Sequence, residues 1–214
     1  MKYREIIIEQ LRGLPYFDKK SVMQISEGYY IKSRTVDSYI SRSLKCKDIV
    51  QLRNGLYVTM DFYDKNKGDV AYKYYLANIT RTPSYVSSWT ALQYYGLTTE
   101  IVNTITSVTK KVTREYATKA GTFSYNSIKS DLFSGFLQVS GKFEFFIATP
   151  AKALFDLLYF KTNQFKGITF DVIDSLVEGV RVDFDEMEEK DKVEFYKLVK
   201  KQLNIAQEHK EISN

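Results

Sequence analysis

Residues 33–45 have the sequence Ser-Arg-Thr-Val-Asp-Ser-Tyr-Ile-Ser-Arg-Ser-Leu-Lys, and residues 49–58 have the sequence Ile-Val-Gln-Leu-Arg-Asn-Gly-Leu-Tyr-Val. At 100° per residue, one side of a helix built from the first segment carries a core-facing stripe: Val36, Tyr39, Ile40, Ser43 and Leu44. In the second segment, two β-rich runs flank Asn54 and Gly55, a pair that accepts the positive φ angles of a tight turn. The two segments therefore predict a helix followed closely by a β-hairpin.

Two shorter helices are expected before this pair. The first covers residues 2–12 and ends at Gly13, and the second covers residues 19–27 with Asp18 as its N-cap. Ser33 is the expected cap of the third helix. Three short helices followed by a hairpin are typical of a winged helix-turn-helix, in which the last helix enters the major groove of DNA. We therefore assign residues 1–60 to such a DNA-binding domain, with the hairpin as its wing.

The net charge of the chain is concentrated in this domain. Residues 1–60 hold 11 Lys and Arg against 6 Asp and Glu, whereas residues 61–214 hold 20 of each kind. The whole formal charge of +5 therefore lies in the first quarter of the chain. A basic excess that is confined to one small module is typical of a surface that binds a polyanion.

The side of the third helix opposite the core stripe gathers hydrogen-bond donors, which we call the donor-rich strip: Arg34, Ser38, Ser41, Arg42 and Lys45. The major groove presents base-edge acceptors between two phosphate backbones, so this strip is expected to contact double-stranded DNA. Asp37 lies at its edge, where it either accepts from cytosine or is solvated. A basic amphipathic helix on its own is also compatible with a merely solvated face. Further DNA contacts are expected from residues around the strip: Lys19, Lys20, Lys32, Lys47, Arg53 and Asn54.

The rest of the chain predicts an α+β domain. Residues 61–69 are polar and contain Gly68, which indicates a linker or loop before a domain over residues 70–214. Helices are expected over residues 70–80, 88–95, from Pro150, and over a charged segment at 183–207, with residues 208–214 frayed. Strands are expected over residues 85–87, 104–109, 122–125, 135–139 and 143–147. This order favours a mixed, mostly antiparallel sheet with helices.

The residues of nucleophilic and metal chemistry are nearly absent from the sequence. The chain has one cysteine, Cys46, and one histidine, His209, so it holds neither a Ser–His–Asp arrangement in the second domain nor a His/Cys zinc site. No glycine-rich nucleotide loop occurs. We therefore expect no enzyme activity, cofactor or metal. A metal-dependent nuclease that uses Asp131, Glu144 or Asp156 is disfavoured, because no Lys stands two positions after Glu144.

The sequence also gives expectations about the cellular compartment. A single cysteine fits a reducing environment, and no run of residues approaches the length and apolar character of a membrane span. The first residues are charged, and the apolar run of residues 6–8 is too short for a signal peptide. We therefore expect a cytoplasmic protein without a membrane partner.

Several motifs together resemble the AbiEi family, the antitoxins of AbiE abortive-infection toxin–antitoxin systems. The hairpin carries Arg-Asn-Gly-Leu-Tyr at residues 53–57. The second domain carries Tyr-Val-Ser-Ser-Trp-Thr-Ala-Leu at residues 85–92, Gly-Leu-Thr at 96–98, Gly-Phe at 135–136, and Ala-Thr-Pro-Ala-Lys-Ala-Leu-Phe-Asp at 148–156. The resemblance covers about residues 1–160.

The resemblance implies a phage-defence antitoxin that is also a transcription repressor. The first domain would bind inverted repeats in the promoter of its own operon and repress it. The second domain would counter a nucleotidyltransferase-like toxin without forming a stable complex with it. The resemblance gives no residues for this antitoxin activity. Lys152 and Asp156 lie one helical turn apart, so a surface or half-buried ion pair is expected. A ligand-sensing regulator that has no toxin partner is the alternative.

Overall fold

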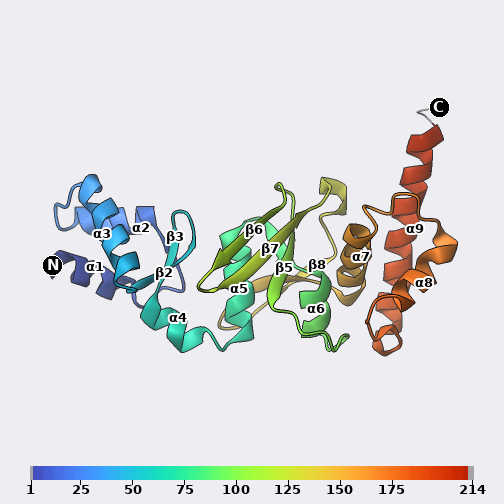
Figure 1. The fold of residues 1–214 in the computed structure, drawn as a ribbon, viewed down its shortest axis with the longest axis horizontal. Coiled ribbons are helices and arrows are strands. Elements are labelled where there is room, and N and C mark those ends of the chain that lie inside the picture. Colours follow the sequence, from blue (N-terminus) through green and yellow to red (C-terminus); the bar gives the residue numbers. More distant parts are fainter. Residues whose placement is uncertain (1, 212–214) are drawn as a thin grey trace.

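The computed structural model describes the backbone of residues 2–211 and the side chains of residues 3–204. The chain forms an elongated molecule with the N-terminal helices at one end, a six-stranded sheet in the middle and the last helices at the other end (Figure 1). The fold is mixed α+β, as the sequence predicts. In the described part of the chain, no helix has both the length and the apolar character that crossing a bilayer requires.

The N-terminal part contains the predicted helices and hairpin. Its elements are α1 (Lys2–Leu11), β1 (Phe17–Asp18), α2 (Lys19–Glu27), α3 (Ser33–Lys45), β2 (Ile49–Arg53) and β3 (Leu56–Thr59). Helices α1 to α3 fit a helix-turn-helix, and the strands form an antiparallel sheet in the order β1-β3-β2. The Asp18 cap of α2 is confirmed, because its Oδ1 accepts from the Ser21 backbone N–H at 2.8 Å. This hydrogen bond holds the pKa of Asp18 below its ordinary value.

The start of α3 differs from the prediction by one residue. Ser33 is the first helical residue, and Lys32 is the N-cap, with no side-chain hydrogen bond to the helix. The reason lies in the backbone, because the N–H groups of Thr35 and Val36 donate to the Lys32 carbonyl. The first backbone hydrogen bonds of α3 are therefore accepted by Lys32, one position before Ser33, the residue predicted as the cap.

The β2–β3 hairpin separates two hydrophobic cores. Its turn is made by Asn54 and Gly55, and Gly55 has φ +78° as the predicted turn requires. One set of hairpin residues, including Ile49 and Tyr57, packs with the N-terminal helices. The alternate residues belong to the core of the second part of the chain: Val50, Leu52, Leu56 and Val58. The hairpin is thus buried on both faces and joins the two parts of the molecule.

The segment expected as a linker or loop is largely helical. Helix α4 covers Met60–Asn66 and is capped by Thr59, whose Oγ1 accepts from the Phe62 backbone N–H at 3.3 Å. Phe62 packs on Tyr72 and Phe143 of the second part. Apolar residues inside this polar stretch therefore fasten it to the core. A linker prediction based on its polarity alone misses that contact.

The second part is built around the six-stranded sheet. Its strands are β4 (Ser84–Val86), β5 (Thr104–Thr109), β6 (Arg114–Thr118), β7 (Gly121–Ser127), β8 (Phe136–Val139) and β9 (Phe145–Ala148). They lie in the order β6-β7-β5-β4-β9-β8, with three antiparallel and two parallel neighbouring pairs. The mostly antiparallel sheet is as predicted, but the sequence analysis did not predict the edge strand β6.

Helices cover this sheet and extend the molecule away from the hairpin. The α-helices are α5 (Val70–Thr80), α6 (Ser88–Tyr94), α7 (Pro150–Lys161), α8 (Ile173–Glu178) and α9 (Glu189–Glu211). Single 3₁₀ turns are η1 (Ser130–Leu132), η2 (Phe170–Val172) and η3 (Phe184–Glu186). Helix α5 packs against β4, β5 and β9, and α7 packs against α6 and α9. The sheet is therefore linked through α7 to the last helix.

The last helix is shorter at its start and longer at its end than predicted. The first residues of the charged segment form η3, in which Phe184 packs against Phe195 and Tyr196. Helix α9 begins only at Glu189 and runs to Glu211, through part of the segment expected to fray. Residues 212–214 of that segment lie outside the described residues.

The end of α3 gives a prediction about stability. Lys47 follows the helix with φ +61°, a left-handed conformation that glycine adopts without the steric cost of a Cβ. We expect Lys47→Gly to raise the free energy of unfolding by about 1 kcal/mol. Lys45→Gly is the control, because it lies inside the helix and is expected to lower stability by about 1 kcal/mol. Urea unfolding of both variants measures the difference, and a loss of stability in Lys47→Gly would contradict it.

Candidate nucleic-acid interface

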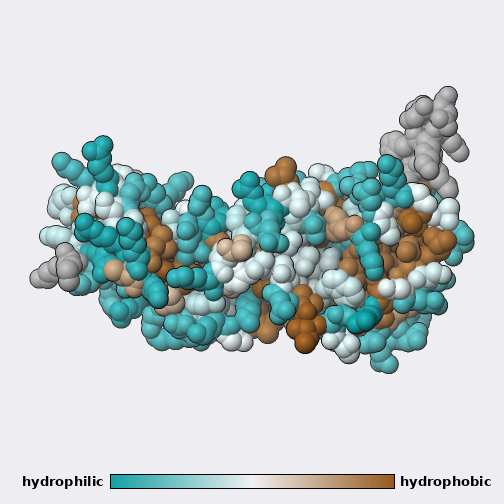
Figure 2. Space-filling view, viewed as in Figure 1, coloured by the Kyte–Doolittle hydropathy of each residue, from teal (hydrophilic) through white to brown (hydrophobic). Residues whose placement is uncertain are grey.

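All five residues of the donor-rich strip are exposed on the outside of α3. Val36, Ile40 and Ser43 on the opposite side are buried, and Tyr39 and Leu44 pack partly buried against the same core. The helix therefore presents the predicted face to its own core and the donor face to solvent. Figure 2 shows mainly hydrophilic residues over α2 and α3. The strip is not covered by the second part of the chain.

The one carboxylate at the edge of the strip has a basic partner. Lys19 Nζ lies 2.6 Å from Asp37 Oδ1, and both side chains are about half exposed, at 42% and 59%. This ion pair offsets the negative charge beside the strip and brings the start of α2 next to α3. An exposed pair of this kind contributes only about 0–1 kcal/mol, so Lys19 can exchange Asp37 for a phosphate at little cost.

The other predicted phosphate contacts surround the strip. Lys20 lies in the first turn of α2, Lys32 caps α3, and Lys47 follows the end of α3; all three are exposed. Basic side chains thus lie at both ends of the helix that carries the strip. Together with Lys19, these side chains are placed to contact the phosphate backbone of a DNA duplex on which α3 lies.

The sequence predicts that the Arg53 side chain reaches outward from the hairpin tip, but in the structure it is bound to neighbouring backbone carbonyls. Its Nε donates to the Thr80 carbonyl at the end of α5 at 2.8 Å, and its Nη1 donates to the Asn54 carbonyl at 3.0 Å. The physical reason is that the end of α5 supplies an acceptor beside the hairpin. Asn54 is exposed, and its side-chain oxygen accepts from Gln51 Nε2 at 3.3 Å. Arg53 therefore holds the hairpin to the second part of the chain.

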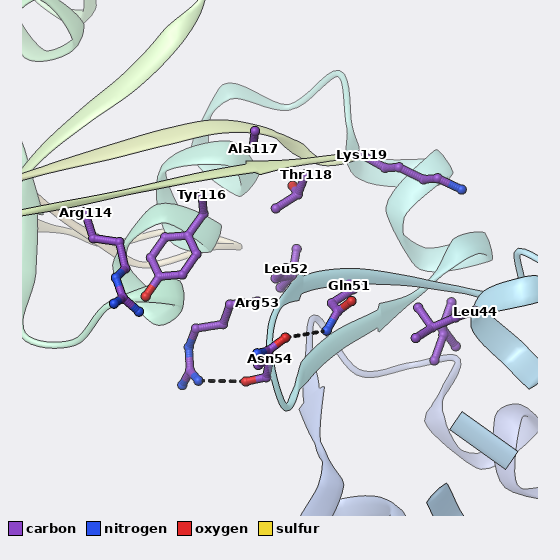
Figure 3. A pocket seen from close by; sticks show the side chains of 11 residues that line it. Leu44, Gln51, Leu52, Arg53, Asn54, Arg114, Tyr116, Ala117, Thr118 and Lys119 are labelled. Carbon is purple, nitrogen blue, oxygen red and sulfur yellow. Dashed lines mark hydrogen bonds between the residues drawn. The ribbon is translucent and has the colours of Figure 1, made fainter. Parts of the chain in front are cut away.

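A groove of about 610 Å³ lies between this hairpin and strand β6. Three cationic side chains line it, Arg53, Arg114 and Lys119, and none of its described lining residues is acidic. Figure 3 shows Arg114 and Lys119 near the two ends of β6, with Arg114 beside Arg53 of the hairpin and the Lys119 side chain extending away past the hairpin. Leu44 and Ile49 also line the groove, so it continues from the end of α3. We call it the hairpin groove.

The sequence pattern does not predict β6 and therefore gives no indication of Arg114 and Lys119. The strand sequence Arg-Glu-Tyr-Ala-Thr is rich in charge and does not predict a strand strongly. Its register with β7 places Arg114 opposite Tyr125 and Thr118 opposite Gly121. A strand spacing of two would find Arg114 but not Lys119, since Ala117 and Lys119 line the groove as well as Arg114, Tyr116 and Thr118.

The groove gives a second prediction. If a DNA phosphate backbone lies along the hairpin groove, the double variant Arg114→Gln, Lys119→Gln should lower the affinity of the protein for all duplexes to a similar degree. The salt dependence should fall by about 1 in log–log slope for each phosphate contact that is lost. The double variant Lys161→Gln, Lys166→Gln is a matched control, because it also removes two positive charges and both lysines are exposed, at the end of α7 and beyond it. Fluorescence anisotropy with a labelled duplex measures this, and equal affinity in double variant and control would exclude a role for the groove.

The motifs that suggested the AbiEi resemblance meet in a buried polar cluster in the second part. Lys152 Nζ lies 2.6 Å from Asp156 Oδ1, and the two side chains are only 1% and 0% exposed. Asp156 Oδ2 accepts from Tyr85 OH at 3.0 Å and from Ser87 Oγ at 2.7 Å. The expected surface or half-buried pair is therefore wrong, because β4 and its following residue cover it. We call these four residues the buried cluster.

The surroundings of the buried cluster are tightly packed. Gly135 has φ +72°, and a Cβ at this position would lie 3.1 Å from Lys152 Cβ and Cγ. Lys152 Nζ also lies 4.6 Å from the centre of the Phe155 ring. Burial raises the pKa of Asp156 above its ordinary value, although Lys152 acts in the opposite direction, and burial raises the pKa of Tyr85 well above its ordinary value. A fully enclosed pair of this kind holds β4 against α7.

No family model matches the chain, and no curated protein matches it.

The carboxylates considered for a nuclease lie in different surroundings. Asp156 is enclosed in the buried cluster, and Glu144 is exposed and accepts from Gln138 Nε2 at 2.8 Å. Asp131 is exposed in η1. Within the described residues, no three or more His, Cys, Asp or Glu side chains gather in a way that would hold a metal ion.

Proposed function

We propose that this protein is a cytoplasmic DNA-binding repressor of its own operon and the antitoxin of a phage-defence toxin–antitoxin system. Its N-terminal part would act as a winged helix-turn-helix that places α3 in the major groove. The observation that carries the proposal is the exposure of the whole donor-rich strip, with Asp37 at its edge paired to Lys19. A strip of donors without a free carboxylate fits base-edge acceptors between phosphates.

The basic residues outside the strip support the same partner. Lys20, Lys32 and Lys47 flank α3, and the hairpin groove adds Arg114 and Lys119 beside the end of that helix. Phosphate contacts of this kind position a protein on DNA, whereas the strip would supply the base contacts. Inverted repeats in the promoter would present two such half-sites.

The antitoxin part of the proposal depends on the resemblance of the second domain to AbiEi proteins. The residues that carry it include Tyr85 and Ser87 in one motif and Lys152 and Asp156 in another, and hydrogen bonds join the two motifs. A shared structural core explains why such distant segments would occur together. The opposed toxin would be a nucleotidyltransferase-like protein that this chain counters without a stable complex.

Co-expression with the product of the adjacent reading frame tests the antitoxin part. The full-length chain is required, because deletion of residues 1–60 would remove Val50, Leu52, Leu56 and Val58 and expose the apolar residues of the second part on which they pack. We expect growth rescue by the native chain and by Arg42→Ala, which impairs only DNA binding. Growth arrest that neither chain relieves would contradict the antitoxin role and leave the repressor role standing.

A further inference from the structure

A pocket of about 430 Å³ lies beside α5, the helix whose end also contacts the hairpin. Four aromatic rings line it: Tyr75 from α5, Phe133 after η1, Phe136 from β8 and Phe146 from β9. Phe133 and Phe136 meet edge to face at 5.2 Å, and Phe136 and Phe146 do so at 5.9 Å. Because the rings lie at steep angles, their faces and edges point in different directions around the pocket. Phe146 is 41% exposed, which is unusual for a phenylalanine in a sheet.

The charge of this pocket is the reverse of that in the hairpin groove. Glu144 is the one charged side chain among its described lining residues, and neither Lys nor Arg lines it. Gln138 Nε2 donates to Glu144 Oε2 at 2.8 Å, which orients the carboxylate beside Phe146. Aromatic faces attract cations through their quadrupole, and a neighbouring carboxylate adds to that attraction.

The wall of the pocket also contains polar groups that lack partners within the described residues. Asn78 Nδ2 and Ser84 Oγ are buried and make no hydrogen bond, and both residues line the pocket. Asn78 cannot simply turn to find a partner, because its Oδ1 already accepts from the Phe146 backbone N–H at 2.6 Å. Both atoms are enclosed by the wall itself, so they do not face the open space of the pocket.

We propose that this pocket binds an organic cation, a substituted ammonium compound. The aromatic rings and Glu144 would hold the ammonium group. The chain already pairs an ammonium with one of these rings, since Lys110 Nζ lies 5.3 Å from the centre of Phe133. Of the other three rings, Phe136 stacks on Tyr85 with ring centres 4.6 Å apart and Tyr75 stacks on Tyr72, so Phe146, at 41% exposure, is the ring most open to a ligand.

The position of the pocket connects it to the N-terminal part of the chain. Helix α5 lines the pocket with Tyr75 and Asn78, and Tyr75 also packs against Tyr16 with ring centres 6.1 Å apart. The Thr80 carbonyl at the end of the same helix holds Arg53 of the hairpin. A ligand that shifts α5 therefore acts on two contacts of the DNA-binding part. This coupling depends on the proposed DNA binding, whereas the cation site does not.

Choline and its uncharged isostere 3,3-dimethyl-1-butanol test the cation site by calorimetric titration of the full-length protein. We expect choline to bind at least about 5-fold more tightly than the isostere, as a desolvated cation–π contact would produce. Phe146→Leu keeps an apolar wall but removes a ring, so it should lower the preference for choline. Glu144→Gln should lower it as well. Leu137→Ala is the control, because Leu137 is exposed on β8 but does not line the pocket.

Three results would overturn the cation site: no binding of choline, equal binding of both compounds, or an unchanged preference in Phe146→Leu. Lys110→Ala provides a further check, because removing a like charge from Phe133 should leave choline binding equal or tighter. A marked loss of choline affinity in that variant would also contradict the site.

The coupling is tested by the affinity for a promoter duplex with saturating choline chloride against an equal concentration of sodium chloride. We expect a change of at least about 3-fold, and by reciprocity the duplex must change choline affinity by the same factor. Choline binding with unaltered DNA affinity would overturn the coupling alone. Choline binding without any DNA binding would instead defeat the proposed repressor function and leave the cation site standing.

Discussion

Asp156→Asn is expected to lower the free energy of unfolding by about 3–5 kcal/mol, because it leaves the Lys152 ammonium without its carboxylate. Both side chains are fully enclosed, with 1% and 0% exposure, so water cannot replace the lost partner. Tyr85 and Ser87 also donate to Asp156 and would each face a weaker acceptor. Urea unfolding followed by circular dichroism measures the change.

A fourfold variant separates the cost of an orphaned charge from the value of the cluster. Replacing all four residues of the buried cluster by apolar ones, Lys152→Met and Asp156→Leu with Tyr85→Phe and Ser87→Ala, removes both charges and both hydroxyl donors together. This variant should cost less than Asp156→Asn, because removal of a buried ion pair that leaves no polar group without a partner is often near neutral. Lys67→Met is the control, since its pair with Asp64 is exposed. An Asp156→Asn variant as stable as the native chain would show that the pair is not enclosed as described.

Arg42→Ala is expected to weaken binding to the promoter duplex by about 1–3 kcal/mol, roughly 5- to 150-fold, if Arg42 makes a bidentate contact to guanine. The loss should depend on sequence, so the variant should discriminate poorly between the promoter and an unrelated duplex. Lys47→Ala should instead weaken binding to both duplexes to a similar degree, because a phosphate contact carries no sequence information. Gel-shift titration with both duplexes distinguishes the two patterns.

Arg12→Ala is the matched control for Arg42→Ala. Arg12 is also an exposed arginine of the N-terminal part, but it lies just after α1 and pairs with Glu9 at 2.9 Å. Removing it changes the net charge equally without touching the donor-rich strip. Equal losses in both variants would mean that α3 reads no base and that only overall charge matters.

The features that the sequence predicted correctly are local ones. The Asp18 cap depends on residues three positions apart, and the turn at Asn54 and Gly55 depends on the φ angles of neighbouring residues. The two faces of α3 follow from helical periodicity alone. These patterns are visible in a single sequence because the interacting groups are close together along the chain.

The features that the sequence missed depend on distant contacts. Tyr85 and Ser87 reach Asp156 across about 70 positions, so nothing near Asp156 shows that its pair with Lys152 is enclosed. Arg53 was expected at a free tip, but the acceptor that holds it is Thr80 on α5. Strand β6 is charged, and its pairing with β7 rather than its composition makes it a strand. In each case tertiary contacts decide a question that local pattern leaves open.

The most direct test of the donor-rich strip is the affinity of the full-length protein for a duplex from its own promoter at two salt concentrations. Six basic side chains are expected on phosphates, so the logarithm of the affinity should fall with the logarithm of salt concentration with a slope of about −5 for each bound chain. They are Lys19, Lys20, Lys32, Lys47, Arg114 and Lys119. Arg42→Ala should weaken binding at both concentrations. An affinity that neither salt nor the Arg42→Ala change alters would contradict the account.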